Sequence, residues 1–202
     1  QIKFNLNGFI PKIPTGAIHG QRAYMELSEI LGQYEYIKDF DNLVIPFKCN
    51  ATDLISGQDI LFSKGSLITS MRASFSIPSI FSPVDYNGYL LVDGGVKNNI
   101  PVNLAQKYNP DIIITSAVTS SKPTKNQIQL SILDVIGESI FIHTSDLTKL
   151  NLENSDYVIS TQIPEGINAI FTQKNIKAIY NAGKREAYNN IDLFLEIKKK
   201  VG

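Results

Sequence analysis

The sequence predicts an α/β fold in which a mostly parallel sheet is flanked by helices. Segments with the apolar spacing of helices alternate with short segments rich in β-branched residues, and most connections between them are short. An apolar fraction of 43% over 202 residues is enough for a sizeable core. We therefore expect a single domain over 1–202, in which Gly and Pro residues make 1–18 a loop or covering segment.

Two helices and two strands are predicted in the first part of the chain. Apolar residues recur on one helical face in 19–34, and a second, short helix is indicated at 66–74. Strands are predicted at 43–51 and 59–62, where β-branched and aromatic residues are frequent. Polar residues and a glycine between these strands favour a turn.

The middle of the chain combines a strand end with a helix start. A short apolar strand at 89–92 is ended by Asp93-Gly94-Gly95. Asn98 or Asn99 is then placed to cap a helix that has Pro101 in its first turn.

The last part of the chain continues the alternation of strands and helices. Strands are predicted at 111–118 and 157–160. A helix at 127–147 is apolar on most sides, so we expect it to be well buried. A single amphipathic helix is predicted at 175–198.

Charge and composition argue against several classes of function. The 19 Lys and Arg residues equal the 19 Asp and Glu residues, whereas proteins that bind nucleic acid usually carry a basic excess. One Cys and two distant His residues provide no ligand spacing for a metal, so none is expected. The sequence has no apolar run of about 18 residues, which predicts no spanning helix.

Asp93 is the first candidate for chemistry. In open α/β sheets, ligands gather at the carboxyl ends of strands, which is where Asp93 is predicted. The following glycines, Gly94 and Gly95, allow positive φ angles and a close approach of the backbone. From these residues alone, an ordinary turn and an active-site loop both remain open.

Five stretches in order resemble the patatin-like phospholipase family in its bacterial branch. They are Ile45-Pro46-Phe47, Ala51-Thr52-Asp53-Leu54 with Gly57, Gly65-Ser66-Leu67, Met71-Arg72-Ala73-Ser74-Phe75-Ser76-Ile77-Pro78 with Phe81-Ser82-Pro83-Val84, and Leu91-Val92-Asp93-Gly94-Gly95-Val96 with Asn98-Asn99-Ile100-Pro101-Val102. The resemblance implies a patatin-like layered fold and a lipid acyl hydrolase of phospholipase A or lysophospholipase type, without a cofactor. Its substrate would be a phospholipid or a lysophospholipid, and contact with a membrane surface is implied.

The same resemblance implies a Ser-Asp dyad, with Asp93 as the base and Gly94, Gly95, Asn98 and Asn99 supporting its loop. A serine hydroxyl needs such a proton acceptor to become a nucleophile. The family's Gly-x-Ser-x-Gly elbow has no counterpart here, because Ser66 and Ser139 both lack the glycine pattern. We therefore expect that the N-terminal part of the domain is missing and that this chain alone is inactive.

Several alternatives stay open beside this hypothesis. The chain could be a non-catalytic lipid-binding or scaffold module, or part of a membrane-associated assembly. Arg72 could bond loop carbonyls or contact a substrate phosphate. His19, at a helix start, and His143, expected in a core or an interface, accompany no elbow, so a Ser-His-Asp triad is rejected.

Location and association are predicted only in outline. The resemblance leaves the bacterial cytoplasm and the cell envelope both open. A truncated sheet would expose an edge and apolar surface, so we expect self-association or association with the missing N-terminal segment.

Overall fold

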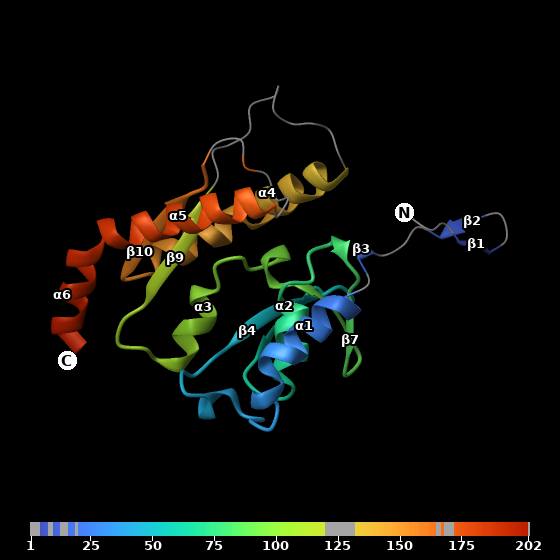
Figure 1. Ribbon diagram of the computed structural model, residues 1–202, viewed down its shortest axis with the longest axis horizontal. Coiled ribbons are helices and arrows are strands. Elements are labelled where there is room, and N and C mark those ends of the chain that lie inside the picture. The colour runs from blue at the N-terminus through green and yellow to red at the C-terminus, as the bar shows by residue number, and fades with distance from the viewer. Residues whose placement is uncertain are drawn as a thin grey trace. The chain divides into compact units, whose positions relative to one another are not determined.

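The computed structural model describes residues 5–7, 10–12, 16–18, 20–119, 132–164, 167 and 172–201 (Figure 1). These residues fall into two compact units, which we describe separately. The first unit comprises the described parts of Gln1–Pro101 and Ile132–Thr148, and the second those of Val102–Ser131 and Lys149–Gly202. Both contain helices and strands, so the predicted mixture of α and β structure is confirmed.

A four-stranded antiparallel sheet is the centre of the first unit. Its order is β5 (Asp59–Phe62), β4 (Cys49–Asp53), β8 (Tyr89–Asp93) and β7 (Val84–Tyr86). Parallel pairing among the described strands is limited to two-stranded pairs. The prediction of a mostly parallel sheet is therefore not confirmed.

Tight turns explain the antiparallel order. The sequence Asn87-Gly88 joins β7 to β8, and both residues have positive φ angles, 51° and 84°, as a type I′ hairpin turn requires. The turn between β4 and β5 is closed by the N–H of Gly57, which donates to the carbonyl of Asp53. Because strands joined by such short turns must run antiparallel, these local signals override the α/β alternation.

The predicted strand at 43–51 begins later than expected. Strand β4 starts only at Cys49, because the preceding residues form a surface turn after the short 3-10 helix η2 (Phe40–Asn42). The N–H of Phe47 closes this turn on the carbonyl of Phe40, and Pro46 has no N–H for a strand ladder. Val44 and Ile45 are consequently exposed.

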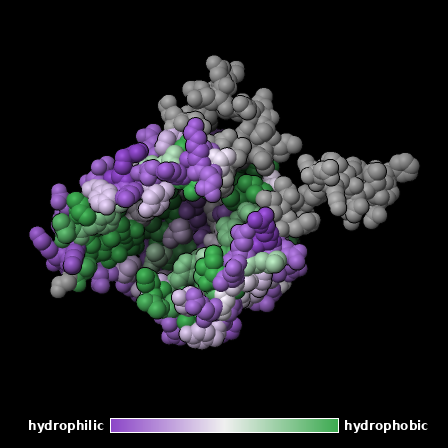
Figure 2. Space-filling view, viewed as in Figure 1, coloured by the Kyte–Doolittle hydropathy of each residue, from purple (hydrophilic) through white to green (hydrophobic). Residues whose placement is uncertain are grey.

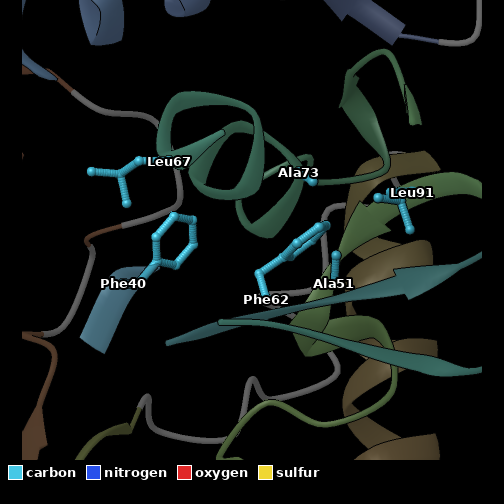
Figure 3. Close-up of a cluster of buried hydrophobic side chains, with 6 residues drawn as sticks. All are labelled: Phe40, Ala51, Phe62, Leu67, Ala73 and Leu91. Atoms are coloured by element: carbon cyan, nitrogen blue, oxygen red, sulfur yellow. The ribbon is translucent and has the colours of Figure 1, made fainter. Parts of the chain in front are cut away.

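Helix α2 (Leu67–Ser74) confirms the helix predicted at 66–74, and it packs against β4 and β8 of the sheet. Ser66 caps it by accepting a hydrogen bond from the N–H of Thr69. The helix and sheet enclose a cluster of buried side chains, shown in Figure 3: Phe40, Ala51, Phe62, Leu67, Ala73 and Leu91. Apolar burial of this kind is the main stabilising contribution to the unit.

The remaining elements of the first unit are mostly short. Helix α1 (Gln21–Leu31), which falls within the predicted 19–34, packs against α2 and continues into η1 (Gly32–Tyr34). The described parts of 1–18 contain three short strands. Two of them, β1 (Asn5–Asn7) and β2 (Ile10–Lys12), pair with each other, and β3 (Gly16–Ile18) pairs with β6 (Ser79–Phe81).

Helix α4 (Ile132–Glu153) departs from its prediction. It ends later than the predicted 127–147, at Glu153, and residues 127–131 lie outside the described part of the chain. Phe141 and Ile142 are exposed, and His143, predicted in a core or an interface, is exposed too. Apolar side chains of α4 therefore remain in contact with solvent, and the expectation of a well-buried helix was wrong.

The second unit contains a parallel strand pair with helices. Strands β9 (Ile114–Thr119) and β10 (Tyr157–Gln162) pair in parallel, near both predicted positions. Helix α3 (Val102–Ala105) and the 3-10 helix η4 (Gln106–Tyr108) precede β9, and helix α5 (Gln173–Asn189) packs on β10.

The predicted single helix at 175–198 is two helices, α5 and α6 (Ile191–Val201), which meet at Asn190. The Asn190 side chain donates to the Glu186 carbonyl and to its carboxylate. Asparagine favours such helix ends because its side chain competes with the helical hydrogen bonds.

Removal of the Phe40 ring should destabilise the first unit strongly. Phe40 is 0% exposed and belongs to the main cluster. We expect Phe40→Ala to lower the free energy of unfolding by about 3–5 kcal/mol, measured by urea denaturation. The control is Tyr36→Ala, at a site 78% exposed, which should cost about 0.5 kcal/mol or less. Equal losses in both variants would show that the cluster is not the core.

Candidate functional site

Asp93 ends the central strand β8, opposite Ala51 of β4. Its Oδ1 accepts a hydrogen bond of 2.7 Å from the N–H of Gly95. With this bond, Asp93 caps the 3-10 helix η3 (Gly94–Val96). Oδ2 accepts no hydrogen bond from the residues that the structure describes. Burial raises the pKa of the Asp93 carboxyl above its usual range, and the Gly95 N–H opposes this shift. The side chain is therefore a carboxylate with increased basicity.

The two glycines after Asp93 are required by close packing. A Cβ on Gly94 would lie 2.6 Å from the carbonyl oxygen of Asn50, and one on Gly95 would lie 2.9 Å from Oδ1 of Asn99. Neither glycine has a positive φ angle. Of the two properties expected of these glycines, the loop therefore uses the close backbone approach and not the positive φ.

A network of polar side chains attaches the Asp93 loop to strands β4 and β5. Oδ2 of Asp59 accepts a hydrogen bond of 2.8 Å from Nδ2 of Asn98, and its Oδ1 accepts one of 3.1 Å from Nδ2 of Asn50. Asn50 also donates to the carbonyl of Asn98, and the N–H of Asn98 donates to the carbonyl of Gly94. The Asn98 side chain thus binds Asp59 of β5. Helix α3 begins only at Val102, so the prediction that Asn98 or Asn99 caps this helix is not confirmed.

A second contact fixes the Asp93 backbone from the side of α2. The N–H of Asp93 donates to the carbonyl of Ser76 at 3.0 Å, and Ser76 is fully buried. The Ser76 hydroxyl donates to the carbonyl of Arg72 and accepts from its guanidinium. Asp93 is therefore held by β4, by the Asp59 network and by the residues after α2.

Arg72 connects the two ends of the segment that follows α2. It is 4% exposed, and its guanidinium donates to the Ser76 hydroxyl at 2.5 Å and to the Ser82 carbonyl at 3.2 Å. The same group lies over the rings of Phe75 and Phe81, 5.5 and 4.9 Å from their centroids. Arg72 thus bonds oxygen atoms of Ser76 and Ser82 within the protein. Of the two alternatives given for Arg72, these contacts agree with the bonding of loop oxygens and not with a phosphate contact.

Asp93 lines a pocket of about 270 Å³ that belongs to the first unit. Most of its lining is apolar or small and comes from the segment after α2, the Asp93 loop and helix α4: Ile77, Pro78, Asp93, Gly95, Val96, Asn99, Gly137, Ile140, Phe141 and Thr144. Pockets for drug-sized ligands usually measure about 300–1,000 Å³. This pocket is therefore slightly smaller than a usual pocket for a drug-sized ligand.

Sequence reasoning found Asp93 and its loop but missed their surroundings. Asp59 gave no signal, because its role depends on the register between β4 and β5. Ile140 and Phe141 belong to the helix that was expected to be well buried, and they line the pocket instead. His19 lies outside the described residues.

Other chemistry is limited in the described part of the chain. Burial raises the pKa of the Cys49 thiol to about 12, although the Ser74 hydroxyl opposes the shift, so the thiol is not a nucleophile at neutral pH. No group of three His, Cys, Asp or Glu side chains gathers there as metal ligands would. Of the helices seen there, none has both the length and the apolarity to cross a membrane.

Comparison with known proteins finds a family match in the first half of the chain. Residues 6–105 match the family model described as patatin-like phospholipase. The chain carries a patatin-like phospholipase family domain over these residues. It is 34% identical over 108 residues to an uncharacterized NTE family protein of Mycobacterium tuberculosis, a match that covers 54% of this chain and 29% of that protein.

Two further relatives have names that state an activity. A lysophospholipase of Candida albicans is 30% identical over 82 residues, which cover 41% of this chain and 6% of that protein. A probable lipid hydrolase of Invertebrate iridescent virus 6 is 44% identical over 43 residues, covering 21% of this chain and 15% of the viral protein. The chain thus matches less than a third of the length of each of these relatives.

Loss of the Asp59 carboxylate should weaken the site and the fold together. Asp59→Ala would leave the buried amides of Asn50 and Asn98 without this acceptor. We expect the free energy of unfolding to fall by about 1–3 kcal/mol, measured by urea denaturation. Asp85→Ala, at an exposed position of β7, is the control and should cost about 0.5 kcal/mol or less. The network would be of no importance to stability if the two losses were the same.

Replacement of Asp93 should have an effect on stability that depends on pH. Because its pKa is raised in the folded state above 3.8, the ionised carboxyl lowers stability at neutral pH, and this cost vanishes as the pH falls below 3.8. Asp93→Asn should therefore gain stability relative to the native chain between about pH 3 and about pH 7. Urea unfolding across this range measures the difference, and a flat or falling difference would contradict the burial of a charged Asp93.

Proposed function

We propose that the protein to which this chain belongs is a lipid acyl hydrolase of phospholipase A or lysophospholipase type, with a Ser-Asp dyad in which Asp93 is the base. The observation that carries the proposal is Asp93 itself. Its carboxylate has a raised pKa, is held by the Gly95 N–H and lines a largely apolar pocket. A general base works best when its pKa is moved toward the working pH, which burial does here.

The proposed reaction passes through an acyl-enzyme. Asp93 accepts the proton of a serine hydroxyl while the serine oxygen attacks the ester carbonyl, and it gives this proton to the alcohol oxygen as the ester C–O bond breaks. Asp93 then accepts a proton from the water that attacks the acyl-serine, and it returns this proton to the serine oxygen as the fatty acid leaves. Backbone N–H groups would stabilise the oxyanion in both steps. We propose that the serine and these donors belong to residues N-terminal to this chain.

The pocket supports a lipid as the substrate. Ile77, Val96, Ile140 and Phe141 provide apolar surface beside the carboxylate, which fits an acyl chain whose ester lies at Asp93. The relatives named as a lysophospholipase and as a probable lipid hydrolase support the same class. The mycobacterial relative supports the bacterial branch of the family.

Supporting roles are proposed for the loop residues. Gly94 and Gly95 allow the close packing of the Asp93 loop, and Asn98 attaches that loop to Asp59. Asn99 lies at the pocket beside Gly95, where it could contact the substrate ester. These four residues would position Asp93 and not take part in proton transfer.

The test needs the longer protein, extended upstream of Gln1 in its reading frame. We expect this protein to release fatty acid from lysophosphatidylcholine, and we expect the 202-residue chain alone to be inactive. Asp93→Asn in the longer protein should reduce kcat by a factor of at least about 10². Asp85→Asn is the matched control, because it removes an exposed carboxyl from β7 and should leave kcat unchanged.

Two results would overturn parts of the proposal. Full activity of Asp93→Asn would show that Asp93 is not the base. Lipid binding by the longer protein without any hydrolysis would favour the non-catalytic module, because the apolar pocket alone can account for binding.

A further inference from the structure

Helix α5 presents an unusual face to solvent. The helix packs against β10, and its Ala182 is buried. In contrast, Ile176, Tyr180 and Tyr188 are 47%, 66% and 64% exposed. Ile176 and Tyr180 are four residues apart and are neighbours on the helix surface, and Tyr188 lies two turns further on, rotated by about 80° from Tyr180. The solvent side of a surface helix is normally polar, and this one is aromatic and aliphatic in part.

Helix α5 also carries exposed basic side chains. Lys174, Lys177, Lys184 and Arg185 are all exposed on α5, and the Nζ of Lys184 lies 5.9 Å from the ring centroid of Tyr188. The single acidic residue of α5, Glu186, is half-buried and accepts a hydrogen bond from Asn190. We call this set of residues, with Ile176, Tyr180 and Tyr188, the α5 face.

The second unit, to which α5 belongs, carries a net positive charge, and the first unit carries a net negative charge. The second unit contains eleven Lys and Arg against seven Asp and Glu residues, and the first contains eight against twelve. Formal charges of +4 and −4 therefore cancel in the neutral total. The α5 face is the part of the positive unit where the basic residues have exposed apolar neighbours.

Helix α6 adds side chains of both kinds. Ile191 and Leu195 are about half-exposed, and Lys198 and Lys199 are exposed near its end. Figure 2 shows strongly hydrophilic residues along α5 and a hydrophobic area at α6 on the same face of the molecule.

We infer that the α5 face docks on an anionic lipid surface. Tyrosine rings favour the headgroup region of a bilayer, aliphatic side chains enter the acyl boundary, and Lys and Arg bind anionic headgroups. A protein partner fits less well, because lysine is depleted in protein–protein interfaces whereas three lysines lie on this face. The docking surface is independent of the proposed hydrolase activity, since it needs neither the serine nor Asp93.

The experiment uses the 202-residue chain and sucrose-loaded vesicles in a sedimentation assay. We expect binding to vesicles of phosphatidylcholine mixed with phosphatidylglycerol and little binding to phosphatidylcholine alone. Added salt should weaken the binding, because it screens the headgroup charge. The double variant Lys177→Gln/Lys184→Gln should lower the partition coefficient roughly 30-fold, since each basic residue near the surface contributes a factor of about five.

Two further variants separate charge from apolar contact. Lys64→Gln/Lys107→Gln removes the same charge at exposed positions that do not belong to the α5 face, and it should change the partition coefficient by less than about fivefold. Tyr180→Ser/Tyr188→Ser should weaken binding while leaving the charge unchanged. All these positions are exposed, so the variants should fold, which circular dichroism verifies.

Three results would overturn the inference. The first is a lack of preference for the anionic vesicles. The second is an equal loss of binding in both lysine double variants. The third is self-association without lipid, seen by light scattering and abolished by the tyrosine variant, which would make the α5 face an interface between two copies of the chain. None of these results would bear on Asp93.

Discussion

The pairing of β4 with β8 is the constraint on which the rest of the first unit depends. It places Ala51 opposite Asp93 in the middle of the antiparallel sheet. The same strand carries Asn50, whose amide reaches Asp59 and whose backbone leaves no space for a side chain at position 94. Strand β4 therefore fixes the end of β8, the backbone conformation of the residues that follow Asp93, and the hydrogen bonds between Asn50 and Asp59.

Helix α2 provides an independent support on the other side. Its Arg72 donates hydrogen bonds to Ser76 and Ser82, and the carbonyl of Ser76 in turn accepts a hydrogen bond from the N–H of Asp93. The residues just after Ser76, Ile77 and Pro78, are part of the pocket wall. The position of the carboxylate and the shape of the pocket are thus determined by the same few hydrogen bonds.

The sequence predicted local features better than their arrangement. Strand β5, helix α2 and the end of β8 lie where apolar spacing and turn residues placed them, because these signals act over a few residues. The direction of the sheet was missed because the Asn87-Gly88 turn was not recognised as a hairpin signal. Helices α5 and α6 were taken as one, because apolar periodicity continues across Asn190 while the hydrogen bonds that end α5 are made by side chains.

The candidate site was predictable only where a motif lies in one stretch of chain. Asp93 and its glycines are adjacent in sequence, and the family resemblance found them together. Asp59 bonds Asn98 of the Asp93 loop, and Ser76 bonds the Asp93 N–H, from other parts of the chain, so only the three-dimensional structure relates them. The exposed tyrosines of α5 could not be recognised either, since a helical period does not tell which apolar residues stay uncovered.

The attachment of Asp93 at three points has a consequence for local unfolding. Loops that bear functional residues usually open at a low free energy, without disturbing the core. Here the N–H of Asp93 is bonded to Ser76, and the next loop residues are tied to β4 and β5, which bound the main cluster. The amide protons of Asp93 and Asn98, which are bonded to the carbonyls of Ser76 and Gly94, should therefore exchange with solvent more slowly than those of an ordinary surface loop.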